Sequence, residues 1–251
     1  MNQEQEHSVI GILGGMGPEA SADLYSKLID RFYRSAGDDM QGYPHLVINN
    51  IPLPNLFQQR GKAVGRYLGQ ECQRLERAGA NVIAMACNSA YLYLDDVRSA
   101  VSGSTVVIDL IAEVARKLEQ DDRYRIGVLS TAMSRPLYVQ ALTQRHRALV
   151  LPNEAEQQRL ETIISHILSG RKEADLKQAL TALSETLVGR SADCIVLGCT
   201  DLSLLMNQGD LSHPLYSSTD VLADVLFDYA SGAQSVGVPQ ADTPATSRRA
   251  L

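Results

Sequence analysis

Short apolar runs alternate with amphipathic stretches along almost the whole chain. The apolar runs are rich in Val, Ile and Leu, as buried strands are, and they occupy residues 9–13, 46–48, 82–86, 106–108, 126–129, 148–151 and 194–197. Helical periodicity separates them, at residues 18–34, 63–78, 90–101, 110–118, 154–168, 175–188 and 219–230 and after Pro136. Strands that alternate with helices in this way predict parallel sheets in an α/β fold.

Two internal sequence repeats with nearly the same spacing predict that the chain has two similar halves. The strand that begins at Ile10 matches the strand that begins at Ile126, 116 residues later, and Cys87 with its preceding strand matches Cys199, 112 residues later. We therefore expect two α/β domains related by a pseudo-twofold axis. The N-terminal domain would comprise residues 1–107 plus 216–231 and the second residues 108–215, with a disordered tail at 232–251 that is rich in Ser, Thr, Pro and Ala.

Composition narrows the functional classes. The chain has 251 residues, 45% of them hydrophobic, and a formal net charge of −6 without a basic block, so nothing favours nucleic-acid binding. No apolar run approaches the roughly 18–20 residues that a membrane span needs, and the N-terminus lacks the basic and apolar regions of a signal peptide. A cytoplasmic protein without a membrane partner is the resulting expectation. The five histidines show no metal-binding spacing.

The two repeated cysteines are the candidates for chemistry. Each follows a predicted strand, at the carboxyl edge where ligands bind in open α/β sheets, and each precedes polar residues of the kind that begin helices, Asn88-Ser89 and Thr200-Asp201. A helix N-terminus would lower the thiol pKa from its reference of about 8.5. Two thiols on opposite sides of a planar intermediate could remove an α-proton from one face and return one to the other.

Purely structural roles are an alternative to catalysis and ligand binding at these cysteines and at the glycine-rich loop. Cysteine is among the residues most often buried for packing alone, and this is the simpler interpretation of Cys72 and Cys194. The glycine-rich loop between Gly11 and Gly17 lacks the GxGxxG spacing of dinucleotide-binding loops. A tight turn from strand to helix, or backbone amides that receive a carboxylate, explains this loop better. The residues alone leave catalytic and structural roles open for Cys87 and Cys199.

Three motifs together resemble the aspartate/glutamate racemase superfamily, and within it the aspartate racemase branch. They are Gly14-Gly15-Met16-Gly17-Pro18-Glu19-Ala20, Ala86-Cys87-Asn88-Ser89-Ala90 and Leu197-Gly198-Cys199-Thr200-Asp201-Leu202. The resemblance covers residues 8 to 231 and implies two α/β domains with the active site in the cleft between them. It also implies a racemase of D-amino-acid metabolism that uses two cysteines as base and acid, with no pyridoxal phosphate or other cofactor, no metal, and a homodimeric assembly.

The resemblance also implies where the substrate binds. Its contacts fall on the glycine-rich loop, on the second strand and the loop after it, on the residues after each cysteine, on the turn after the strand at 126–129 and on a basic residue of a later helical region. In this sequence the corresponding residues are Gly15, Met16, Asn50, Arg60, Asn88, Ser89, Thr131, Ser134, Lys172 and Thr200.

Two positions depart from the family pattern. Tyr91 stands where the first cysteine motif usually ends in histidine, and Ser217-Ser218 stands where an aspartate is common. The favoured function is cofactor-independent racemisation of an acidic amino acid, aspartate or glutamate. The alternatives are a cis-trans isomerase or another carbanion or thiol-adduct enzyme of the same superfamily, and a non-catalytic protein that binds a small ligand.

Overall fold

The computed structural model describes residues 8–36, 43–52 and 61–234. They form two parallel four-stranded sheets and the helices that connect the strands. Arg60 and the tail from residue 235 lie outside the described residues. The strand orders are β2-β1-β3-β4 and β6-β5-β7-β8. Each strand of the first sheet has a counterpart at the same place in the second sheet, which confirms the two similar halves predicted from the internal sequence repeats.

The first sheet contains β1 (Val9–Gly14), β2 (His45–Asn50), β3 (Val82–Met85) and β4 (Val106–Val107). Its connections are α1 (Pro18–Ala36), α2 (Lys62–Arg77), the 3-10 helix η1 (Asn88–Tyr93) and α3 (Leu94–Ala100). β1 and β3 are the central strands and are almost wholly buried. The expected single helix at 90–101 is wrong in detail, because a 3-10 turn occupies its start.

The second sheet contains β5 (Arg125–Ser130), β6 (Ala148–Val150), β7 (Cys194–Gly198) and β8 (Leu215–Ser217). Its helices are α4 (Leu110–Gln120), α5 (Arg135–Gln144), α6 (Glu154–Leu168), α7 (Ala174–Gly189), η2 (Thr200–Leu204) and η3 (Gln208–Asp210). A capping box fixes the start of α6, because Asn153 accepts from the Glu156 amide and Glu156 accepts from the Asn153 amide.

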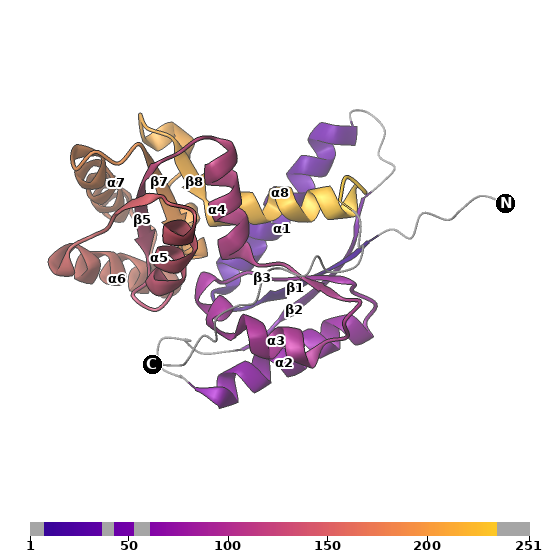
Figure 1. Cartoon of the computed structure of the whole chain (residues 1–251). Helices are drawn as coiled ribbons and strands as arrows, with labels where there is room; N and C mark the ends of the chain where they lie inside the picture. The colour runs from indigo at the N-terminus through magenta and orange to yellow at the C-terminus, as the bar shows by residue number, and fades with distance from the viewer. Residues whose placement is uncertain (1–7, 37–42, 53–60, 235–251) are drawn as a thin grey trace.

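The last helix, α8 (Ser218–Ala230), returns from the second sheet to the first domain and packs on α1 and α4 (Figure 1). The chain returns after Ser217 and not at 216 as expected, because Tyr216 and Ser217 still pair with β7. The Ser217 hydroxyl accepts from the Asp220 amide and thereby caps the start of α8.

Two hydrophobic cores support this arrangement. The larger core joins the first sheet to α4, α5 and α8, and the smaller one fills the space between the second sheet, α6 and α7. Across the described ranges, no helix combines the length and the apolar character needed to cross a bilayer. Residues of α5 belong to the larger core, so the two domains share packed surface as well as covalent connections.

Candidate active site at the domain interface

Cys87 lies just beyond the carboxyl end of β3. Its backbone is extended, at φ −157° and ψ 120°, and the preceding Ala86 amide still donates to the Leu13 carbonyl of β1. The side chain is 8% exposed. Because β3 is a central strand of a parallel sheet, it presents Cys87 at the sheet edge where α/β proteins bind ligands.

Cys199 occupies the equivalent place in the second domain. It follows β7, has an extended backbone at φ −138° and ψ 128°, precedes η2 and is 6% exposed. β3 and β7 hold the same position in their sheets. The correspondence predicted between the two cysteine motifs is therefore present in three dimensions.

The structure brings these two strand ends together. The Thr200 hydroxyl, next to Cys199, donates to the carbonyl of Ala86, next to Cys87, at 3.3 Å. Burial and Asp201 are the main causes that raise the pKa of Cys199, and a negative charge on Cys87 raises it further. Cys72 and Cys194 are buried elsewhere, in α2 and at the start of β7, where the pKa of Cys72 is raised to about 12 by burial and by Glu71.

The expectation that both thiol pKa values are lowered is wrong. Burial raises the pKa of Cys87 to about 12, with a further rise from Asp201, and the amides of Ala90 and Ser89 offset this only in part. Burial and Asp201 likewise raise the pKa of Cys199. The cysteines are themselves the N-cap residues, and they precede 3-10 helices of six and five residues. Such short helices contribute little dipole, so desolvation dominates.

Three expected substrate residues form a chain of hydroxyl groups that crosses the interface. Ser89, from η1 of the first domain, lies 3.1 Å from Thr131 Oγ1, at the end of β5. Thr131 Oγ1 lies 2.9 Å from Ser134 Oγ and accepts from the Ser134 amide. All three residues are buried. Ser89 and Thr131 connect the domains, and Ser134 lies behind them on the second-domain side.

Asn88 also connects the domains. Its Oδ1 accepts from the Tyr138 hydroxyl of α5 at 2.6 Å, and its Nδ2 donates to the Ser218 hydroxyl of α8 at 2.9 Å. Both groups of the amide are thus engaged by protein, and the residue is 2% exposed. In this structure Asn88 supports the interface instead of offering its side chain to a substrate.

The glycine-rich loop after β1 is held by Ser21 of α1. Ser21 Oγ accepts from the Gly15 amide at 2.9 Å and lies 3.1 Å from the Gly17 carbonyl. Gly15 has φ +96°, and a Cβ there would stand 2.1 Å from the Ile51 carbonyl oxygen, so this turn requires glycine. The Gly15 amide therefore stabilises the loop, although the sequence had suggested it for a carboxylate.

Three further expected residues lie around this loop or beyond it. Met16 is buried within the loop, and the exposed Asn50 ends β2 beside Gly14. Lys172, from the segment between α6 and α7, binds Glu19 in the first turn of α1, with Nζ 2.8 Å from Oε2. This exposed ion pair also joins the two domains. Arg60 falls outside the described residues.

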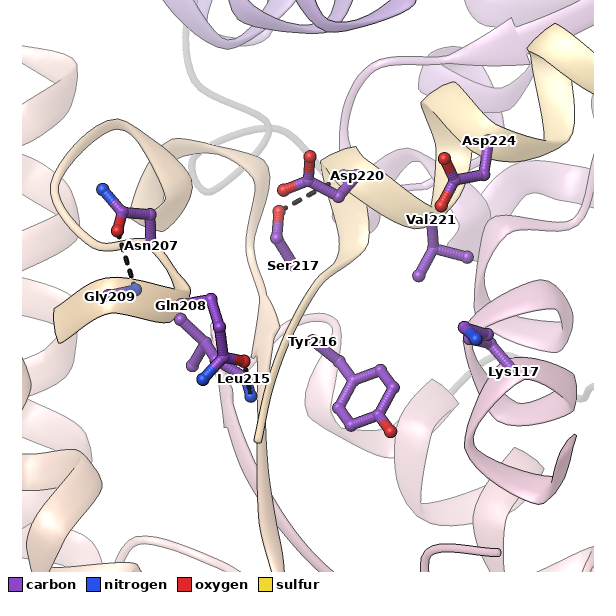
Figure 2. A pocket seen from close by; sticks show the side chains of 10 residues that line it. All are labelled: Lys117, Asn207, Gln208, Gly209, Leu215, Tyr216, Ser217, Asp220, Val221 and Asp224. Carbon is purple, nitrogen blue, oxygen red and sulfur yellow. Dashed lines mark hydrogen bonds between the residues drawn. The ribbon is translucent and has the colours of Figure 1, made fainter. Parts of the chain in front are cut away.

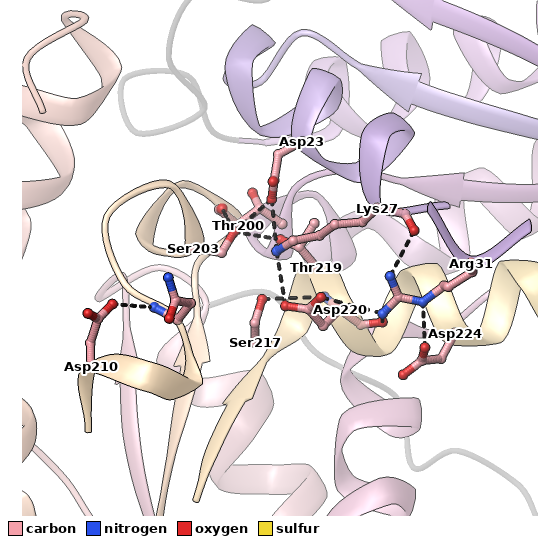
Figure 3. Close-up of polar contacts among 11 residues, drawn as sticks. Asp23, Lys27, Arg31, Thr200, Ser203, Asp210, Ser217, Thr219, Asp220 and Asp224 are labelled. Carbon is pink, nitrogen blue, oxygen red and sulfur yellow. Dashed lines mark hydrogen bonds and ion pairs between the residues drawn. The ribbon is translucent and has the colours of Figure 1, made fainter. Parts of the chain in front are cut away.

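A polar network behind Thr200 connects η2 with α1 and α8 (Figure 3). Ser203 Oγ lies 2.7 Å from the Thr200 carbonyl oxygen and 3.1 Å from Asp23 Oδ2. Lys27 Nζ lies 3.0 Å from carboxylate oxygens of both Asp23 and Asp220. The segment that carries Cys199 is thereby attached to two helices of the first domain.

A surface cavity of about 440 Å³ lies between α4, η3, β8 and the start of α8 (Figure 2). Lys117, Tyr216 and Asp220 are among its lining residues. It contains none of the residues expected in the active site. It lies where the chain passes between the two domains.

Comparison with known proteins agrees with this geometry. The model of the Asp/Glu/hydantoin racemase family matches residues 13–226. The chain belongs to this family. It is 25% identical over 223 residues to the broad specificity amino-acid racemase RacX of Bacillus subtilis, covering 86% of this chain and 95% of that protein.

Solved structures show the same fold. An aspartate racemase homologue from Pyrococcus horikoshii superposes with a TM-score of 0.74 at 28% identity, covering 89% of this chain and 99% of the other. Aspartate racemase from Picrophilus torridus gives 0.72 at 23% identity, covering 89% and 94%. The predicted α/β fold with two parallel sheets and the aspartate racemase branch are confirmed, as is membership among the PLP-independent amino-acid racemases, which are isomerases.

Tyr91, the departure from the family histidine, has a structural role in this racemase-family chain. Tyr91 is fully buried, and its hydroxyl accepts from the Met85 amide at 3.2 Å. The neighbouring strand β4 is too short to reach this amide of β3. Burial raises its pKa far above the neutral range. Tyr91 therefore completes the hydrogen bonding of β3 and does not replace a titrating imidazole.

Sequence reasoning missed three residues that the structure places at the site. Tyr138 and Ser218 hold Asn88, and Asp201 contacts Cys199. The sequence predicts Asp201 only as a residue that begins a helix. Its place in the same strand-end motif as a candidate catalytic cysteine was a usable signal. Tyr138 and Ser218 are distant in sequence from Asn88 and gave no local signal.

Proposed function

We propose that this chain racemises an acidic amino acid, aspartate or glutamate, by proton transfer between Cys87 and Cys199 without a cofactor. One observation carries the proposal. Two buried cysteines end equivalent strands of two similar domains, and a hydrogen bond from Thr200 to Ala86 holds those strand ends against each other. Inversion at an α-carbon needs such a pair of acid/base groups that approach from opposite sides.

In this mechanism one cysteine, as thiolate, removes the α-proton. The other, as thiol, protonates the opposite face, and the reverse reaction exchanges their roles. Negative charge develops on the substrate carboxylate in the intermediate. The hydroxyls of Ser89, Thr131 and Thr200 would stabilise that charge, because preoriented donors in a buried site act more strongly than water does.

The substrate carboxylates need further donors near the thiols. We assign this role to the loop at Met16, to Asn50 and to Lys172. Lys172 would exchange its contact with Glu19 for a carboxylate of the substrate. Arg60 and Ser134 remain proposed contacts that rest on the family pattern, and Gly15 would act by shaping the loop. A homodimer remains an expectation, which size-exclusion chromatography with light scattering can test.

A racemase with a broader amino-acid range is the second candidate. Asp201 is buried beside Cys199, and its pKa is raised mainly by this burial and to a smaller extent by the charge of Glu19. Two carboxylates at the site would disfavour the side chain of an acidic substrate and favour a neutral or cationic one. The similarity to RacX, whose name states a broad specificity, points the same way.

The test is α-proton exchange in D2O. The protein is incubated without added cofactor with each enantiomer of aspartate, glutamate, alanine and lysine, and NMR and chiral chromatography follow exchange and inversion. We expect exchange with inversion for the wild type. We expect loss of inversion by about 10²-fold or more in Cys87→Ser and in Cys199→Ser, whereas Cys72→Ser serves as the matched control.

Each outcome separates the candidates. Exchange confined to aspartate or glutamate supports the first candidate, and exchange of alanine or lysine supports the second. If either catalytic-site serine variant kept wild-type inversion of both enantiomers, the two-base mechanism would be refuted. Absence of exchange with every amino acid would instead favour the isomerase or ligand-binding alternatives.

A further inference from the structure

The carboxylate of Asp201 lies against the thiol of Cys199, deep in the domain interface. Its Oδ2 is 3.6 Å from Cys199 Sγ, within reach of an S–H donor, and the residue is 4% exposed. Its Oδ1 faces the glycine-rich loop, where a Cβ on Gly17 would stand 2.7 Å away. The carboxylate is therefore enclosed between the cysteine of one domain and the loop of the other.

Among the residues that the structure describes, this carboxylate has no cationic partner. In the described ranges no lysine or arginine forms an ion pair with Asp201, and Lys172 is engaged by Glu19. Burying an ionised carboxylate without a cation costs stability. An asparagine would fill the same volume without that cost, so a role in packing does not account for an acid here.

The two cysteines differ in their immediate partners. At Cys87, burial raises the thiol pKa most, and the nearby amides of Ala90 and Ser89 lower it in part, although the Ala90 amide itself donates to the Cys87 carbonyl oxygen. The Cys199 thiol donates to the Asp201 carboxylate, with Sγ 3.6 Å from Oδ2, and among the described residues the Cys87 thiol has no such carboxylate partner. A hydrogen bond from S–H to a carboxylate stabilises the neutral thiol.

Other titratable groups surround this pair. Glu19 faces it from α1, Cys87 from the end of β3 and Tyr138 from α5. Burial raises the pKa of Tyr138 far above neutrality, so its hydroxyl stays protonated. Asp201 opposes ionisation of both thiols, and Glu19 acts on Asp201 itself. Of the two thiols, Cys199 is the one that contacts the Asp201 carboxylate within the described ranges.

We propose that Asp201 holds the proton on Cys199, so that the free enzyme presents Cys199 as the acid and Cys87 as the sulfur that ionises first. The proposal rests on the proposed function and assigns unequal roles within it. The Cys87 thiolate takes the α-proton and becomes a thiol, and Cys199 gives its own proton to the opposite face and becomes a thiolate. Asp201 repels that thiolate, which favours reprotonation of Cys199 from solvent while Cys87 loses its proton to solvent.

The test uses the full chain without substrate. Iodoacetamide alkylation is followed at several values between about pH 7 and 9, around the reference thiol pKa, and peptide mass spectrometry reports the rate at each cysteine. In the wild type we expect Cys87 to react about tenfold faster than Cys199 or more. In Asp201→Asn we expect Cys199 to react about tenfold faster than in the wild type, one pKa unit, with a smaller gain at Cys87.

Two variants serve as comparisons. Asp201→Glu keeps the charge and should keep the wild-type ratio of the two rates, and Asp175→Asn removes an exposed carboxylate of α7 and should change neither rate. A variant that merely loosens the fold would accelerate both cysteines together. Faster alkylation of Cys199 than of Cys87 in the wild type would overturn the proposal without any variant, as would an unchanged rate ratio in Asp201→Asn.

The outcome is independent of turnover. If the wild type shows the expected alkylation order but exchanges no α-proton, the proposed function fails and the protonation assignment stands. If the wild type racemises an amino acid but Asp201→Asn leaves the alkylation ratio unchanged, the function stands and the assignment of Asp201 is wrong.

Discussion

Replacing Asn88 by alanine distinguishes a residue that holds the domains together from one that contacts substrate. The side chain accepts from the Tyr138 hydroxyl at 2.6 Å and donates to the Ser218 hydroxyl at 2.9 Å. Tyr138 comes from α5 of the second domain, and Ser218 begins α8. All three side chains are buried, so water cannot replace the lost partner without opening the interface.

The expected loss of stability follows from these contacts. Alanine removes both hydrogen bonds and leaves the hydroxyls of Tyr138 and Ser218 buried without this partner, and each such group costs about 1–3 kcal/mol. We expect a total loss of about 2–6 kcal/mol for the two groups. Because about 1 kcal/mol lowers the melting temperature of a protein of this size by about 2–4 °C, the midpoint should fall by about 4–24 °C.

The assay is thermal unfolding followed by circular dichroism, with a double-mutant cycle. Tyr138→Phe keeps the ring and removes only the hydroxyl, so it should cost about 1–3 kcal/mol. Asn88→Ala combined with Tyr138→Phe should cost less than the sum of the two, with a coupling of about 1 kcal/mol or more, because the residues share one buried bond. Ser134→Ala in the neighbouring hydroxyl chain is not part of that bond and should add to Asn88→Ala with little coupling.

The kinetic behaviour provides the refutation. A substrate contact would raise KM in Asn88→Ala while the melting temperature stayed within about 1 °C of the wild type. That result, together with zero coupling to Tyr138→Phe, would show that the interface role is wrong and that the expectation from the sequence was right.

Three further predictions concern the same interface. Gly15→Ala should destabilise the protein by more than about 2 kcal/mol in chemical denaturation, because φ is +96° and the added Cβ would stand 2.1 Å from the Ile51 carbonyl oxygen; unchanged stability would contradict the described loop. Lys172→Met should raise KM for an acidic substrate at least about tenfold, since about 1.4 kcal/mol of charge interaction is lost, and an unchanged KM would remove Lys172 from the site. Asp201→Asn should stabilise the fold above about pH 6 and not at about pH 4. Burial raises the pKa of this carboxyl from 3.8 to about 6, so the folded state disfavours its ionised form. The difference in unfolding free energy between the two proteins should approach about 3 kcal/mol at most, and equal melting curves at pH 8 would contradict this prediction.

Local patterns in the sequence were sufficient for most elements of the fold. The helix predicted at 154–168 has the bounds of α6, because the Asn153–Glu156 capping box marks its start. The short apolar runs became strands, because period and length together indicate strands between helices. The central strands β3 and β7 are fully buried, whereas the edge strand β2 is partly exposed. The prediction of one helix at 90–101 was less accurate, because the polar residues after Cys87 form a 3-10 turn whose side chains bond to the other domain.

The candidate site was predictable only in part, and the limit is physical. Cys87 and Cys199 were found because each carries its own strand and its own motif. Their pKa direction was predicted wrongly because desolvation arises where two domains meet, and a sequence window contains one side of that interface. The partners of Asn88 were missed for the same reason, since Tyr138 lies 50 residues away along the chain.

The same contacts explain why the fold and the proposed chemistry cannot be separated. The Thr200 hydroxyl donates to the Ala86 carbonyl, and the Ser89 hydroxyl hydrogen bonds to the Thr131 hydroxyl. Each of these bonds joins a cysteine motif to the opposite domain. They bury both thiols, and burial is the largest cause of the raised thiol pKa values. Each bond contributes about 1 kcal/mol net, and the Lys27 ion pairs behind Thr200 attach the same segment to the first domain. A substrate that separates the two motifs would therefore free the hydroxyls of Ser89, Thr131 and Thr200 for its carboxylate at the moment when the thiols become accessible.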